Sequence, residues 1–330
     1  MITQLRPSFI CHIADRLGCG LAIILRGLYL QLKSDEEWAL ISILLDSAAH
    51  YERGRCFVFD GIVSCIEHSL PNSIEPGQYF FQENDDESMP VQCALMIVKI
   101  LCKFVSGVYE NDSTYASHAV YSLEKVYNYL CHRGLIEINE GEEKIERFTP
   151  DHKLWNNVCN AFHLMSLSSE NDLAEKGIES LHRMLLSPKV HHIPHEGWIT
   201  ILDLLTAKHP MIKNEKVRMK SFDLLVRMLL IHTPPLCQRE EHLKMLTIVI
   251  NRTVGLAAEN LNVGRQGSVS SLFESTVQLV TNLSNVLLMP SFASDSKFCT
   301  WAGNLLIMEL EKVGAGGGSI RMIAATSADA

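Results

Sequence analysis

The sequence predicts an all-α protein. Apolar residues recur every three to four positions through most of the 330 residues, and no series of alternating strands interrupts them. The helical segments are short, so each needs a neighbour to cover its apolar face. Helix pairs recur about every 40 residues, which is the spacing of HEAT or armadillo units. We therefore expect a degenerate HEAT/armadillo-like α-solenoid of about eleven helices, with a compact all-α bundle as the alternative.

The first region, residues 1–132, is expected to hold N-terminal helical repeats. Ser34 is placed to cap a helix, and Glu37 follows at the spacing of a capping box. Residues 70–90 contain prolines and the acidic run Asp85–Glu87, which predicts an exposed loop. The apolar stripes on either side predict the helices, and in the first helix the stripe consists of Ile10, Ala14, Leu17, Leu21, Ile24 and Leu28.

The second region follows an acidic, glycine-containing stretch at residues 133–150. We expect this stretch to be a linker loop, with Leu135, Ile136 and Ile138 as a brief extended piece. Short, regular stripes over residues 151–313 predict C-terminal helical repeats, in which Asn214 caps a helix. Residues 314–330 are rich in Gly, Ala and Ser and carry no stripe, which predicts a disordered tail.

Composition excludes several classes of protein. The formal net charge is −9, so the chain lacks the basic footprint of a nucleic-acid binder. Hydrophobic residues make up 47%, which excludes disorder for most of the chain. The ten cysteines form no C-x-x-C pair and mostly lie among apolar residues, so we interpret them as reduced core cysteines of a cytosolic protein. No window reaches the ~18 apolar residues of a membrane span, and no secretory signal is present, so we expect no transmembrane segment.

The densest group of histidines is His191, His192 and His195. Histidines can bind a divalent metal, but no cysteine or aspartate with ligand spacing joins them. Pro188 and Pro194 place the group in a turn before a helix. We interpret it as a polar turn and predict no metal site there.

Other polar features also have structural interpretations. The acidic runs Asp85–Glu87 and Glu140–Glu143 lack the ligand pattern of an EF-hand and are interpreted as solvated loops. Gly18, Gly20 and Gly27 follow no strand, so close helix packing or a kink explains them better than phosphate binding.

One helix edge is basic, and we interpret it as a solvated face, with an acidic partner or anionic lipid as the alternative. Its residues are Lys213, Lys216, Arg218 and Lys220. The sequence contains no G-x-S-x-G, no H-E-x-x-H and no P-loop. We therefore assign no catalytic residue, no cofactor-binding residue, no metal ligand and no cofactor.

Three stretches, taken together and in order, resemble one family. The first runs from His12 to Asp46 and includes Gly20-Leu21 and then Ser34, Glu36, Glu37 and Trp38 at the start of the next helix. The second opens with Leu154-Trp155 and continues into the helix of Ile178, Leu181 and Leu185-Leu186. The third runs from Val217 to Leu236, with Arg218-Met219 and a Pro-Leu exit. They resemble the helical region downstream of the catalytic domain in large Arf guanine-nucleotide exchange factors of the Golgi brefeldin-resistance type, the Gea and GNOM group.

The resemblance covers most of residues 12–313 and implies a function. Proteins of this family load GTP onto Arf at Golgi membranes in vesicle-mediated transport, and their downstream regions serve recruitment, partner binding and regulation. The resemblance thus implies a regulatory and scaffolding region, cytoplasmic and peripheral at the Golgi, whose partners belong to the Arf trafficking pathway. The glutamate-bearing loop of the exchange domain is missing, so no catalytic residue carries over and enzyme activity is left open. The alternatives are a generic helical-repeat adaptor unrelated to Arf and an all-α enzyme without a local motif.

Overall fold

The computed structural model describes residues 7–32, 34–70, 89–109, 113–136, 152–186, 195–236 and 240–263. Within these ranges the regular structure consists of ten α-helices and two short 3-10 helices, without a strand. The prediction of an all-α protein is therefore confirmed. The helices expected after residue 264, the disordered tail at 314–330 and most of the loop at 70–90 lie outside the described residues.

The chain divides into two compact units, Met1–His192 and Ile193–Ala330. This division lies further along the chain than the linker expected at residues 133–150. The first unit contains α1 (Pro7–Gly27), η2 (Tyr29–Gln31), α2 (Asp35–Ala49), α3 (Glu52–Ser69), α4 (Val91–Val105), α5 (Ser113–Ile136), α6 (His152–Ser166) and α7 (Asn171–Leu185). The second contains α8 (His195–Lys208), η5 (His209–Met211), α9 (Glu215–Leu236) and α10 (Glu240–Val263).

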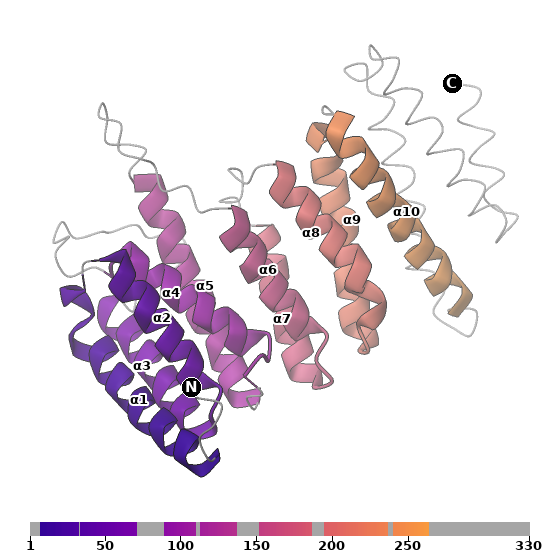
Figure 1. The fold of residues 1–330 in the computed structure, drawn as a ribbon. Helices are drawn as coiled ribbons and strands as arrows, with labels where there is room; N and C mark the ends of the chain where they lie inside the picture. Colours follow the sequence, from indigo (N-terminus) through magenta and orange to yellow (C-terminus); the bar gives the residue numbers. More distant parts are fainter. Residues whose placement is uncertain are drawn as a thin grey trace, which may run out of the picture. The chain divides into compact units, whose positions relative to one another are not determined.

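The helices of the first unit form consecutive hairpins that stack in two layers (Figure 1). The hairpins are α2–α3, α4–α5 and α6–α7. Along the stack, α4 packs against both α2 and α6 in one layer, and α5 packs against both α3 and α7 in the other. Stacked helical hairpins are the arrangement of a helical solenoid, in which each hairpin covers the apolar face of the next.

The apolar stripes of the sequence form the core between these layers. Leu45 of α2 and Ile97 of α4 are fully buried, and so are Trp155 and Phe162 of α6. Full burial of a side chain of this size stabilises the folded state by about 1.5–3 kcal/mol. The 3.6-residue period of the stripes thus identifies the buried face correctly in α2 and α6.

Helix α1 buries Ala14 and Leu21 of its expected stripe, and it also meets α3 through residues outside that stripe. Its contact with α3 is made by small residues, so that the two backbones approach closely. We call these residues the small-residue seam: Ala14, Gly18 and Ala22 of α1 with Gly54 and Gly61 of α3. A Cβ atom on Gly18 would lie 2.9 Å from the carbonyl oxygen of Gly54, and one on Gly61 would lie 2.8 Å from Cα of Ala22. Real Cβ atoms do not approach other atoms so closely, so only glycine fits there.

Two sequence expectations are wrong here and a third is confirmed in part. Leu28, expected on the buried stripe, is 42% exposed and lies beyond the end of α1 at Gly27. Cys19, expected to be a core cysteine, is exposed, because α1 faces α3 with the neighbouring Gly18. Of the three glycines on α1, Gly18 serves close packing, whereas Cβ atoms on Gly20 and Gly27 would meet open space.

Helix ends follow the local sequence signals closely. Ser34 Oγ accepts from the Glu37 backbone amide at 3.2 Å, and the Glu37 carboxylate accepts from the Ser34 amide at 3.1 Å, which completes the predicted capping box. Asn214 caps α9 by accepting from the amide of Val217 at 3.1 Å. The extended piece expected at Leu135 and Ile136 is wrong, because both residues belong to α5.

The second unit is built around α8, which packs against both α9 and α10. Ile201, Leu202 and Leu205 of α8 are buried in its core. The 3-10 helix η5 is held by His209, whose Nε2 donates to the carbonyl of Arg218 at 3.1 Å. Burial of His209 lowers its pKa, although this hydrogen bond acts in the opposite direction. The imidazole is therefore a neutral structural group at physiological pH.

Candidate functional site

The first unit carries a groove of about 360 Å³ on the layer formed by α2, α4 and α6. Its floor is apolar, with Ile100 and Ala161 almost fully buried. The rest of the lining is largely polar and comes from all three helices; the residues that matter below are Asp46, Lys99, Lys103, Asn157 and Asn160. Stacked helices thus bring together side chains that are far apart in the sequence.

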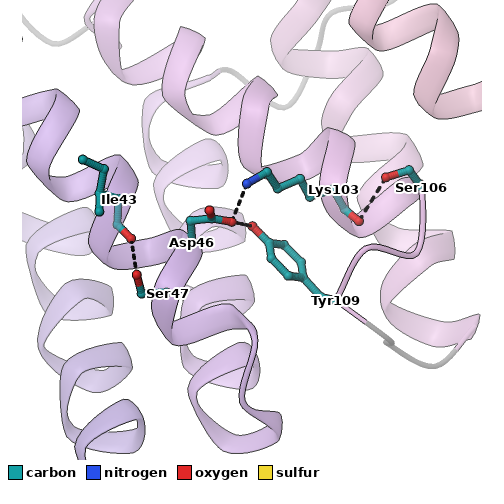
Figure 2. Close-up of polar contacts among 6 residues, drawn as sticks. All are labelled: Ile43, Asp46, Ser47, Lys103, Ser106 and Tyr109. Carbon is teal, nitrogen blue, oxygen red and sulfur yellow. Dashed lines mark hydrogen bonds and ion pairs between the residues drawn. The ribbon is translucent and has the colours of Figure 1, made fainter. Parts of the chain in front are cut away.

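Asp46 of α2 is the centre of a polar network at one side of the groove (Figure 2). Its Oδ1 accepts hydrogen bonds from Nζ of Lys103 on α4 and from the hydroxyl of Tyr109, both at 2.6 Å. Both donors reach the same oxygen from the α4 hairpin, as the close-up shows. The network therefore fixes α2 against α4 and holds the Lys103 cation at the groove.

Tyr109 reaches Asp46 because the chain reverses sharply after α4. Gly107 has φ +76°, a left-handed conformation that glycine adopts without strain. The amide of Gly107 donates to Phe104 at 3.3 Å and that of Val108 to Lys103 at 3.0 Å, which are the two hydrogen bonds of a Schellman motif. The rings of Phe104 and His50 pack edge-on against Tyr109, with centroids 4.9 and 5.2 Å away. The tyrosine is thus held in one orientation.

The electrostatics of the network favour the carboxylate. Burial acts to raise the pKa of Asp46, but the hydrogen bonds from Lys103 and Tyr109 and the charges of Lys103 and His50 outweigh it, so the pKa lies below its ordinary value. The pKa of Tyr109 is raised by burial and by the adjacent carboxylate, so the hydroxyl stays a donor. Asp46 is therefore a weak base whose Oδ1 already accepts two hydrogen bonds, which suits a structural ion pair better than acid–base catalysis.

The thiol at the groove is equally unreactive. Burial raises the pKa of Cys102 to about 12, so the nucleophilic thiolate is scarce at neutral pH. The groove therefore offers hydrogen-bonding groups and positive charge for binding.

Two groups in the groove stay accessible for a ligand. Lys99 of α4 is exposed and forms no ion pair with any residue that the structure describes. Asn157 of α6 is exposed and presents an amide, which both donates and accepts hydrogen bonds. They lie on neighbouring helices of the same layer.

The sequence-predicted polar features fall elsewhere. His191 and His192, and the acidic runs Asp85–Glu87 and Glu140–Glu143, lie outside the described residues. His195 is the first residue of α8, and its ring contacts that of His242 on α10 edge-on, with centroids 5.9 Å apart.

The basic edge of α9 is only partly accessible. Lys213 and Lys216 are exposed, whereas Arg218 and Lys220 are half-buried. Nε of Arg218 is buried and finds no hydrogen-bond partner among the described residues. The four cations therefore do not form one continuous solvated face.

Sequence reasoning missed the groove itself. Asp46 and Lys103 are 57 positions apart, and each occurs in a helix with other exposed polar residues. Their pairing depends on which helices stack, and no local spacing reports that.

Among the residues described, no helix is both long and apolar enough to cross a bilayer.

Comparison with known proteins gives no relative: no protein-family model, no curated protein and no solved structure matches this chain.

Proposed function

We propose that this chain is the regulatory and scaffolding region of an Arf guanine-nucleotide exchange factor in Golgi vesicle transport. The three ordered stretches of the sequence support the Arf part of the proposal. The stacked hairpins of the first unit support the scaffold part and suit a HEAT/armadillo-like solenoid. On this proposal the chain works by binding Arf-pathway proteins at the cytoplasmic face of the Golgi.

The groove on α2, α4 and α6 is the binding site in this proposal. Its presence is the observation that carries the proposal. Lys99 would pair with a carboxylate of the partner, and Asn157 would bond to its backbone. The network of Asp46, Lys103 and Tyr109 is already formed, so binding would cost little ordering of that wall. The expected ligand is an extended, acidic peptide segment.

A charge reversal in the groove tests whether the groove is the binding site. The chain is expressed with a fluorescent tag, and the fraction at Golgi membranes is measured for the wild type, Lys99→Glu and the control Lys213→Glu. Lys213 is also exposed, but it lies just before α9 and not in the groove. We expect Lys99→Glu to lower the Golgi fraction several-fold, since like charges now oppose each other, and Lys213→Glu to leave it unchanged. Equal recruitment of all three would contradict the groove as the binding site.

A nucleotide-release assay separates scaffolding from catalysis. The purified chain is mixed with Arf loaded with a fluorescent nucleotide. Since no catalytic motif is present, we expect release at the rate of Arf alone. Robust acceleration by the isolated chain would overturn the scaffold proposal.

The second candidate is a helical-repeat adaptor with no link to Arf, which the stacked hairpins would serve equally well. A diffuse cytosolic location, together with the absence of Arf-pathway proteins among cross-linked partners, would favour it. Recruitment to the Golgi would count against it.

A further inference from the structure

The second unit carries a cluster of potential metal ligands where the first turns of α8 and α10 meet. Glu196 is the second residue of α8, and Glu241 and His242 are the second and third residues of α10. One ligand atom from each lies within 4.8 Å of the other two. The set combines one imidazole with two carboxylates.

His242 is the buried member of this cluster. Its side chain is only 7% exposed, and Nδ1 is buried without a hydrogen-bond partner among the described residues. Burial therefore fixes the imidazole in place, and Nε2 is the ring nitrogen that faces the two carboxylates.

The position of Nε2 shows where an ion would lie. Nε2 of His242 is 3.9 Å from Oε1 of Glu196 and 3.8 Å from Oε1 of Glu241. Both distances exceed the length of a hydrogen bond, which is at most about 3.2 Å. Two ligand atoms on a tetrahedral zinc ion lie about 3.4 Å apart, because its bonds to nitrogen and oxygen are about 2.0–2.2 Å long, so each carboxylate would have to move about half an ångström closer to Nε2 to share an ion with it.

The two carboxylates can adjust to such an ion. Their side chains are 55% and 68% exposed, so both can change rotamer toward Nε2. His242 is held in place by burial and acts as the fixed ligand. The three side chains leave a fourth position on the ion, which water can fill.

We propose that Glu196, Glu241 and His242 form a binding site for a divalent transition-metal ion of the zinc type. Mixed imidazole and carboxylate ligands favour zinc over magnesium or calcium, which prefer oxygen ligands alone. The ion would join the first turn of α8 to that of α10, which are far apart in the sequence. Its role would be to hold the first turns of α8 and α10 together and so to stabilise the second unit.

Zinc titration of the metal-free full chain tests the proposal, with the wild type and two ligand variants. Glu241→Gln changes an exposed side chain and keeps its shape, so it is expected to fold, and His242→Leu removes the buried ligand. Glu215→Gln is the matched control, since Glu215 is an exposed glutamate in the first turn of α9. We expect one zinc ion bound by the wild type and by Glu215→Gln. Affinity should fall at least about tenfold in Glu241→Gln, and this site should be lost in His242→Leu.

Cobalt identifies the ligands, because the chain also contains cysteines. Co²⁺ bound by thiolate shows a near-ultraviolet charge-transfer band, whereas imidazole and carboxylate ligands do not. We expect a cobalt complex without that band and absent from His242→Leu. The proposal is overturned if the wild type binds no zinc, if all four proteins bind it equally, or if the cobalt complex shows thiolate ligands and survives in His242→Leu.

Discussion

Two polar clusters, one in each unit, differ in how completely their hydrogen bonds are satisfied. In the first unit, Asp46 accepts from Lys103 and Tyr109 at 2.6 Å, so the charged oxygen and both donors have partners. In the second unit, His242 stands 3.8 and 3.9 Å from two carboxylates and bonds to neither. The complete cluster is part of the architecture, whereas the incomplete one is the metal site proposed above. A satisfied network such as that of Asp46 has no need of a further atom, and this is the difference between the two clusters.

Removal of Asp46 should have the largest effect on stability. In Asp46→Ala the buried hydroxyl of Tyr109 loses its acceptor, and we expect the free energy of unfolding to fall by about 2 kcal/mol. Urea denaturation at neutral pH measures this. Asp60→Ala is the control, since Asp60 lies exposed on α3 and should change stability by less than about 0.5 kcal/mol. Equal losses in the two variants would show that the network adds nothing.

The charge of Asp46 should make that contribution depend on pH. Its pKa is lowered in the folded protein, so the stabilisation is complete above the ordinary value of 3.8 and is lost as the pH falls through the folded pKa. Asp46→Asn keeps the shape of the side chain and one acceptor oxygen but removes the negative charge. The wild type should therefore be more stable than this variant by about 1 kcal/mol at neutral pH. Below about pH 4 this advantage should shrink. An advantage that persists unchanged in acid would rule out a charged carboxylate as its source.

Replacement of His242 should have the smallest effect in the absence of metal. Leucine fills a similar volume and has no polar atoms to satisfy, so His242→Leu should leave the unfolding free energy of the chelator-treated chain within about 0.5 kcal/mol. Thermal unfolding with and without zinc completes the measurement. We expect zinc to raise the melting temperature of the wild type alone. A large loss of stability without metal would assign His242 to the architecture, like Asp46.

The fold could be predicted from the sequence because its signals are local. The capping box of Ser34 and Glu37 and the cap by Asn214 each depend on residues three positions apart. The buried stripes of α2 and α6 repeat within one helix. The buried face of α1 was predicted only in part, because the hydrophobic period counts large residues, whereas this helix also packs through Gly18 and Ala22.

The sites could not be predicted, because their residues meet only through tertiary packing. Asp46 and Lys103 come from α2 and α4, and Glu196 and His242 come from α8 and α10. The sequence has no cysteine or aspartate with ligand spacing near His195. In the structure it is the neighbouring Glu196 that meets Glu241 and His242 of α10.

The small-residue seam between α1 and α3 has a consequence for how this protein can change over time. In most of a core, the loss or gain of a methyl group can be absorbed by neighbouring side chains that repack. Along the seam, backbone faces backbone, and no side chain lies between Gly18 and Gly54 to yield. We expect neutral substitutions to accumulate on the outward positions of both helices, such as Cys19 and Gly20, while the facing positions stay small. Distant relatives would then share the spacing of these small residues after their larger residues have diverged.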